Sequence, residues 1–155
     1  MTRYERVDPP EWTEAEAAAQ DAADAAVRRL VHLALLGTAM GTLVGTAAVL
    51  LAMVGVLQLQ ATSPPTESTA VLLIAGGTMG GLFVAAVSAW WILAPLGNWY
   101  RRGMLATVSA FATVLVMLLA FPLRALFGPP GLVTFAILCL IGALLLARRA
   151  RSLAT

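Results

Sequence analysis

Four segments without a charged residue dominate this sequence of 155 residues, and they extend over residues 33–66, 68–100, 103–123 and 125–147. A membrane-spanning helix needs about 20 predominantly apolar residues, and each segment is long enough to supply them. Only 12% of all residues are charged, against about 25% in an ordinary soluble domain. We therefore predict an all-α integral membrane four-helix bundle, with spans at residues 30–57, 70–96, 104–127 and 131–147.

Helix-breaking residues separate the predicted spans. The first connection is polar and contains Pro64 and Pro65, which end a helix because proline lacks a backbone N–H and clashes with the preceding turn. The second connection, around Pro95 and Gly97, has the composition of a turn. The third is a very short break at residues 128–131, where a glycine suits a helix C-terminus and a proline suits the first turn of the next helix.

The arginines predict how the chain is oriented in its membrane. Cationic residues stay on the cytoplasmic side during insertion, and this chain has no lysine. Arginines precede the first span, lie between the second and third, and follow the fourth, whereas only Arg124 falls on the opposite side. We therefore expect a multi-pass protein of the bacterial inner (cytoplasmic) membrane, with both termini, including the basic tail 148–155, in the cytoplasm. The acidic start without an early apolar stretch argues against a cleaved secretory signal.

Residues 1–29 differ in composition from the rest and form a predicted cytoplasmic segment. They contain seven of the eight acidic residues of the chain, which are Glu5, Asp8, Glu11, Glu14, Glu16, Asp21 and Asp24. The part after Thr13 combines alanine with spaced acids, which favours an Ala-rich amphipathic helix, and Thr13 with Glu16 fits a capping box. Tyr4 and Trp12 are candidate surface anchors. Two roles are open for this helix: a solvated extension of the first span, or a helix that docks on a partner's cytoplasmic face.

Glycine recurs at helical spacing in the first two spans, at Gly37, Gly41 and Gly45 and at Gly76, Gly77, Gly80 and Gly81. Apolar burial does not drive helices together in lipid, so close backbone contact between small residues takes its place. We predict that these glycines are surfaces for helix packing, within the chain or against another protein, and that leucine at Gly41 or Gly80 disturbs this packing. Glycines that pack against the ring of a bound pigment or lipid would give the same sequence pattern. The segments starting at Gly37 and Gly76 also align weakly, through duplication or through convergence on one packing need.

The predicted spans lack the groups that membrane enzymes and transporters usually need. Their interiors contain no Asp, Glu, Lys, Asn or Gln, so no proton relay or ion path is predicted. His32 and Cys139 have no metal-ligand spacing, and no catalytic triad or phosphate loop is present. We predict no enzymatic activity, no catalytic residue, no intrinsic cofactor and no metal site, and leave open a bound lipid or contact with a partner's haem or pigment. The net charge of +2 follows from the topological arginines, so we expect no nucleic-acid partner.

Aromatic and cationic residues mark the predicted membrane boundaries. Trp and Tyr favour the headgroup region, and arginine reaches it with its long side chain. The predicted anchors are Trp90, Trp91, Trp99, Tyr100, Arg101, Arg102 and Arg124. Trp90 and Trp91 point in different directions on a helix, so at least one should face lipid or a neighbouring subunit. Arg124 is expected to reach the outer headgroups or to pair with Glu67.

A small bundle without reactive groups is most economically an accessory subunit. We therefore expect a non-catalytic structural subunit that packs against a larger bacterial membrane protein complex, with a respiratory or photosynthetic assembly as one type of host. The first alternative is a small homo-oligomeric transporter or channel, whose path would be lined by threonines such as Thr38, Thr42 and Thr46. The second alternative is an assembly factor that leaves the mature complex.

Overall fold

The structure is a computed structural model that describes residues 14–62 and 66–154, apart from the side chains of residues 121 and 151–154. Its elements are α-helices and one short 3-10 helix, and none of the residues in these ranges lies in a strand. Four of the helices are long and apolar enough to cross a membrane. The all-α fold with four candidate membrane spans is thus confirmed.

Several sequence predictions concern residues outside the described ranges. They are the capping box that begins at Thr13, the anchors Tyr4 and Trp12, and the helix break at Pro64 and Pro65. The acidic segment is therefore described only from Glu14 onward.

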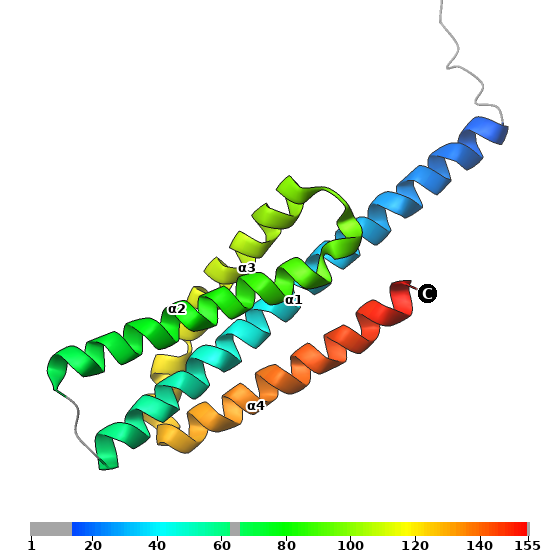
Figure 1. Ribbon diagram of the computed structural model, residues 1–155. Coiled ribbons are helices and arrows are strands. Elements are labelled where there is room, and N and C mark those ends of the chain that lie inside the picture. The colour runs from blue at the N-terminus through cyan, green and yellow to red at the C-terminus, as the bar shows by residue number, and fades with distance from the viewer. Residues whose placement is uncertain (1–13, 63–65, 155) are drawn as a thin grey trace, which may run out of the picture.

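Helix α1 (Glu14–Thr62) joins the acidic segment and the first span in one continuous helix of 49 residues. At 1.5 Å per residue it is about 74 Å long, far more than the hydrocarbon core of a bilayer, which is about 30 Å thick. Residues 14–32 are all exposed, and Figure 1 shows the blue beginning of α1 projecting beyond the other helices. Its many alanines favour the helix even without tertiary contacts. The described part of the acidic segment is therefore a helical extension of the first span.

Helix α1 is also the central helix of the bundle. Helices α2 (Glu67–Ile92), α3 (Trp99–Leu118) and α4 (Ala120–Ala154) all pack against it. Helix α2 packs along α3 as well, whereas α3 and α4 meet only weakly. Figure 1 shows α2 and α4 flanking α1. The bundle is therefore organised around one helix, and it is open between α3 and α4.

A tight turn connects α2 to α3. The 3-10 helix η1 (Ala94–Leu96) follows α2, so the α-helix stops before the end of the predicted span. Gly97 then adopts a φ of 67°, which side chains with a Cβ rarely tolerate. The Asn98 side chain caps α3, because its Oδ1 accepts hydrogen bonds from the backbone N–H groups of Tyr100 and Arg101 at 3.0 and 3.4 Å.

The structure divides the last two helices differently from the sequence prediction. Helix α3 ends at Leu118 instead of continuing to residue 127, because the ring of Pro122 would clash with the Leu118 carbonyl in a continuous helix. The following residues begin α4, which leaves the helical conformation at Gly128, with φ 65° and ψ −161°. Pro129 opens the longer part of α4, where its missing N–H costs no hydrogen bond. The predicted break is thus a kink within α4, and α4 continues beyond the predicted end of the fourth span at residue 147.

Two clusters of small and medium-sized apolar side chains form the core. The first lies between α1 and α4 and consists of Ala47, Leu50, Val54, Ala120, Leu132, Ala136 and Cys139. The second lies near the α2–α3 turn and consists of Ala89, Leu93 and Ala106. Many larger apolar side chains, Phe111 and Leu126 among them, point outward instead. This distribution suits a helical bundle in lipid, where small residues at the contacts let the helices approach closely.

Candidate functional site

The three glycines of α1 lie at its contact with α2. A Cβ added at Gly37 would come within 2.6 Å of Leu93 Cδ2, and a Cβ added at Gly41 would come within 2.7 Å of Ala89 Cβ. A Cβ added at Gly45 would collide with α2 in the same way. Each of these glycines therefore leaves a space that is filled by a side chain of α2 or, at Gly37, by that of Leu93 directly after α2.

Two of the four glycines of α2 lie at the same contact. A Cβ added at Gly81 would collide with Val49, and a Cβ added at Gly77 would come within 2.9 Å of Ala52 Cβ. The contacts recur every three or four residues along both helices, so the two antiparallel backbones approach closely over several turns. We call this contact the α1–α2 seam, and its glycines are Gly37, Gly41, Gly45, Gly77 and Gly81.

The other two glycines of α2, Gly76 and Gly80, lie on a different face of the helix. Both are exposed, and a Cβ added at either would meet nothing within 4 Å among the described residues. Met79 and Phe83, each 70% exposed, flank them, and Leu72 lies one turn earlier. These five residues form the outer face of α2. The sequence pattern places all seven glycines in one class, but the structure separates them into two groups.

A cluster of buried hydroxyl groups joins α1, α2 and α3 beside the seam. It consists of Thr42, Thr46, Ser109 and Thr113, which are at most 9% exposed. Thr42 Oγ1 donates to the Ser109 carbonyl at 3.3 Å, and Thr113 Oγ1 donates to the Thr42 carbonyl at 3.4 Å, so α1 and α3 exchange hydrogen bonds. Ser109 Oγ donates to the Ala85 carbonyl of α2 at 3.5 Å. The sequence indicates Thr42 and Thr46 only as polar residues of the first span, because periodicity cannot show that they face Ser109 and Thr113.

Arg102 connects the end of α2 with the start of α3. Its Cζ lies 4.4 Å from the centroid of the Trp90 ring, and its Nη2 donates to the Trp90 carbonyl at 2.9 Å. Trp99 meets Trp90 edge to face, with ring centroids 6.0 Å apart and an interplanar angle of 81°. Arg102 Nε is buried and has no hydrogen-bond partner in the described part of the chain. Three of the predicted anchors, Trp90, Trp99 and Arg102, therefore form a cluster that stabilises the α2–α3 turn.

The remaining predicted anchors of this turn are exposed. Trp91 and Tyr100 are each 76% exposed, and Arg101 is exposed as well. Trp90 is half-buried while Trp91 is not, because successive residues on a helix point about 100° apart. Figure 1 shows the α2–α3 turn at the same end of the bundle as the projecting part of α1 and the C-terminus of α4. Aromatic and cationic side chains are therefore concentrated at one end of the molecule.

Arg124 lies near the opposite end, in the first turns of α4. It is exposed, and it borders a narrow hollow together with Met53 and Met117. The segment that carries it lies between the end of α3 and the kink at Gly128, on the side where α1 and α2 are connected (Figure 1). Arg124 is therefore separated along the bundle from the other predicted anchors.

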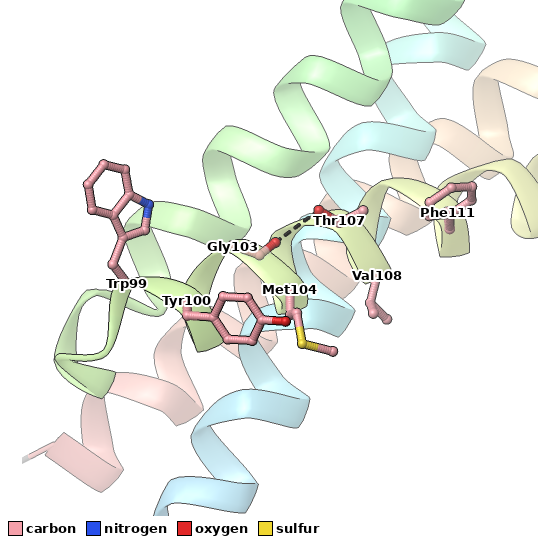
Figure 2. A pocket seen from close by; sticks show the side chains of 7 residues that line it. All are labelled: Trp99, Tyr100, Gly103, Met104, Thr107, Val108 and Phe111. Carbon is pink, nitrogen blue, oxygen red and sulfur yellow. Dashed lines mark hydrogen bonds between the residues drawn. The ribbon is translucent and has the colours of Figure 1, made fainter.

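An apolar hollow of about 760 Å³ lies on the outer side of α3 (Figure 2). Its lining residues all come from α3 and are Trp99, Tyr100, Gly103, Met104, Thr107, Val108 and Phe111. The Tyr100 ring lies beside Met104, whereas Trp99 points away from it (Figure 2). Thr107 Oγ1 donates to the Gly103 carbonyl at 2.9 Å, so this hydroxyl is engaged within the helix. The hollow offers apolar contact that suits a lipid chain or an apolar side chain of another helix.

His32 and Cys139 lie apart from each other. His32 is exposed, and its Nδ1 donates to the Arg28 carbonyl at 2.7 Å, whereas Cys139 is buried in the core between α1 and α4. Across residues 14–62 and 66–154, no group of three or more His, Cys, Asp or Glu side chains is placed to hold a metal ion.

Comparisons of this chain with models of protein families, with curated proteins and with solved structures find no match, so its function is inferred from its own residues.

Proposed function

We propose that this protein is a non-catalytic subunit of a larger membrane complex, and that it packs against its neighbour through the outer face of α2. The observation that carries the proposal is the bare strip formed by Gly76 and Gly80. An added Cβ at either glycine meets no described residue within 4 Å, whereas the five glycines of the α1–α2 seam are covered by other side chains of the chain. Met79 and Phe83 border this strip with exposed side chains. Because small residues allow the close backbone contact that joins helices in lipid, the strip suits a helix of another membrane protein.

The buried polar groups support a structural role. The hydroxyls of Thr42 and Thr113 donate to carbonyls on each other's helices and also lie 2.8 and 2.9 Å from carbonyls one turn back. They are therefore engaged in joining helices instead of facing a solute. Ion and proton paths in membranes usually contain ionisable side chains, and the interiors of the predicted spans carry no acid and no lysine.

The distribution of arginine supports a cytoplasmic location for both termini in a bacterial inner membrane. The bundle has four candidate spans, so the projecting part of α1 and the end of α4 lie at the same end of it. Arg28 and Arg29, Arg101, and Arg148 belong to this end, whereas Arg124 belongs to the other. Cationic residues are retained on the cytoplasmic side during insertion, which favours this orientation over its reverse.

The projecting part of α1 provides a second contact in this proposal. Its described residues include four carboxylates, at Glu14, Glu16, Asp21 and Asp24, and all of residues 14–27 are exposed. A helix that projects about 20 Å from the bundle can reach the cytoplasmic surface of a neighbouring subunit. Because the segment is acidic, it suits a basic surface on that neighbour.

Purification from native membranes in mild detergent, followed by mass spectrometry of the accompanying proteins, tests the proposal. We expect a foreign membrane subunit in fixed stoichiometry with the wild-type chain. A double variant, Gly76→Leu with Gly80→Leu, should lose this subunit without lowering the unfolding temperature, because a Cβ at either position meets no described residue within 4 Å. Gly55→Leu is the matched control, since Gly55 also has open space around it but lies on α1.

Two results would count against the proposal. Retention of the partner by the double variant would show that the outer face of α2 is not the contact. Purification of the wild type as a homo-oligomer that carries solute flux in liposomes would favour a transporter or channel instead.

A further inference from the structure

A second hollow, of about 640 Å³, opens between α1 and the C-terminal part of α4. Its basic lining comes from Arg28, Arg29 and Arg149, and His32 lies beside the two arginines of α1. Its apolar lining includes Leu36 and Ala39 on α1 and Leu146 on α4. Two helices that are remote in sequence therefore build one concave surface with two kinds of lining.

The two kinds of lining are arranged in layers along the bundle. On α1 the cationic residues precede the apolar ones, from Arg28 to Ala39, and on the antiparallel α4 the apolar Leu146 precedes Arg149. Both helices thus place their cations toward the end where α1 projects, and their apolar side chains toward the middle of the bundle (Figure 1). A ligand that fills this surface needs a charged head and an apolar body.

The lining of the hollow indicates that the charged head of the ligand is an anion. None of the described residues that border the hollow is acidic, and Asp21 and Asp24 lie farther toward the start of α1 and are not part of it. Guanidinium groups bind phosphate through paired N–H donors, and basic pockets between membrane helices bind anionic lipid headgroups. A free phosphate ion would use the cations but leave the apolar lining uncovered.

We propose that this hollow binds one anionic phospholipid, whose phosphate lies between Arg28 and Arg149 and whose acyl chain lies along Leu36, Ala39 and Leu146. The site is separate from the outer face of α2 and does not depend on a protein partner. It gives α4, which packs mainly on α1 and weakly on α3, an additional connection to α1 through the lipid.

Lipid binding to the full-length protein in detergent can be measured by native mass spectrometry. The probes are phosphatidylglycerol and phosphatidylcholine with identical acyl chains, and we expect the wild type to bind phosphatidylglycerol more tightly. The variant Arg28→Gln with Arg149→Gln should lose about tenfold or more in affinity for phosphatidylglycerol, because it removes the two arginines between which the phosphate is proposed to lie. The control, Arg101→Gln with Arg148→Gln, removes the same charge from the same end of the molecule outside the hollow, and it should lose less than about threefold.

Two further measurements separate the lipid from other anions and from a folding defect. Ala39→Phe keeps every charge but fills part of the hollow, so it should also weaken phosphatidylglycerol binding while leaving the unfolding temperature unchanged. Glycerol phosphate, which has the headgroup without acyl chains, should fail to displace the lipid. Equal losses in the two arginine variants, equal affinity for the two lipids, unchanged binding by Ala39→Phe, or displacement by glycerol phosphate would each overturn the proposal.

Discussion

Gly41 and Gly80 occupy equivalent places in the two aligned sequence segments, yet their surroundings differ. A Cβ added at Gly41 would collide with Ser109 Oγ and come within 2.7 Å of Ala89 Cβ, whereas a Cβ added at Gly80 would meet nothing within 4 Å. The spacing of small residues shows that a helix has a bare strip, but it does not show which neighbour covers the strip. Leucine should therefore disturb packing within the chain at Gly41, whereas at Gly80 it should disturb only a contact with another protein.

Leucine at Gly41 should destabilise the isolated protein by about 1–3 kcal/mol or more, because the side chain must be forced between α1, α2 and α3. Leucine at Gly80 should not destabilise the protein, because the position is open and leucine is a better helix former than glycine. Thermal unfolding in detergent measures both effects, with Gly55→Leu as a control in open space. Equal losses at Gly41 and Gly80 would contradict this account of the seam.

Arg101 and Arg102 are adjacent in sequence, but Arg102 contacts Trp90 whereas Arg101 is exposed. Arg102→Ala should destabilise the protein by about 2 kcal/mol, because it removes the contact with the Trp90 ring and the hydrogen bond to the Trp90 carbonyl. It should also change the tryptophan fluorescence, since Trp90 loses its cationic neighbour. Arg101→Ala removes the same charge from an exposed position and should leave both the unfolding temperature and the spectrum unchanged. Similar changes in the two variants would argue for a general charge effect.

At the scale of elements, the boundaries of α3 and α4 follow from two local constraints. Pro122 prevents α3 from continuing past Leu118, and Gly128 lets the chain bend within α4. The sequence predicts the second of these constraints from Gly128 and the prolines that follow it. Pro122 also indicates a bend or an end of the third span, but the apolar run continues through it, so hydrophobicity alone extends the predicted span to residue 127.

Gly128 should resist substitution even by alanine. Its φ of 65° and ψ of −161° belong to a region that is populated almost only by glycine, so Gly128→Ala should cost about 1–3 kcal/mol of stability. Gly55→Ala is the matched control, because Gly55 is helical with open space, and alanine is the better helix former. Unfolding experiments on the two variants should therefore give opposite signs, and an unchanged stability for Gly128→Ala would contradict the kinked backbone.

The contact between α1 and α3 depends on hydroxyl groups. Thr113→Val keeps the shape of the side chain but removes the donor to the Thr42 carbonyl, and it should cost about 0.6 kcal/mol, the average for such bonds between membrane helices. Thr107→Val is the control, because Thr107 is exposed and donates only within α3. A comparison of unfolding free energies in the same detergent tests the difference. An equal cost for both variants would show that the bond between helices adds nothing to the local one.

At the scale of the whole molecule, α1 differs from the other helices in two structural respects. It is the surface on which α2, α3 and α4 pack, and it projects beyond them as an exposed acidic helix. The weak contact between α3 and α4 leaves one side of the bundle open. Loss of the contacts with α1 would therefore leave mainly the packing of α2 on α3 to hold the helices together.

The proposed orientation predicts which parts of the whole molecule are accessible from outside the cell. In a Cys139→Ala background, single cysteines at Ala25 and at Thr66 occupy exposed positions at opposite ends of the bundle. A membrane-impermeant maleimide should label the Thr66→Cys variant in intact cells, and the Ala25→Cys variant only after permeabilisation. The reverse pattern would place the termini outside and contradict the orientation inferred from the arginines.

The sequence by itself determined that the chain forms four long apolar helices, because every backbone polar group in lipid must be satisfied within a helix and apolar length is a local property. Only the tertiary structure decided that α1 is central, that Gly81 packs on Val49 while Gly80 stays open, and that Thr113 meets Thr42. The physical reason is that lipid is as apolar as the helices it surrounds, so no hydrophobic periodicity separates the packed face of a helix from its lipid-facing side.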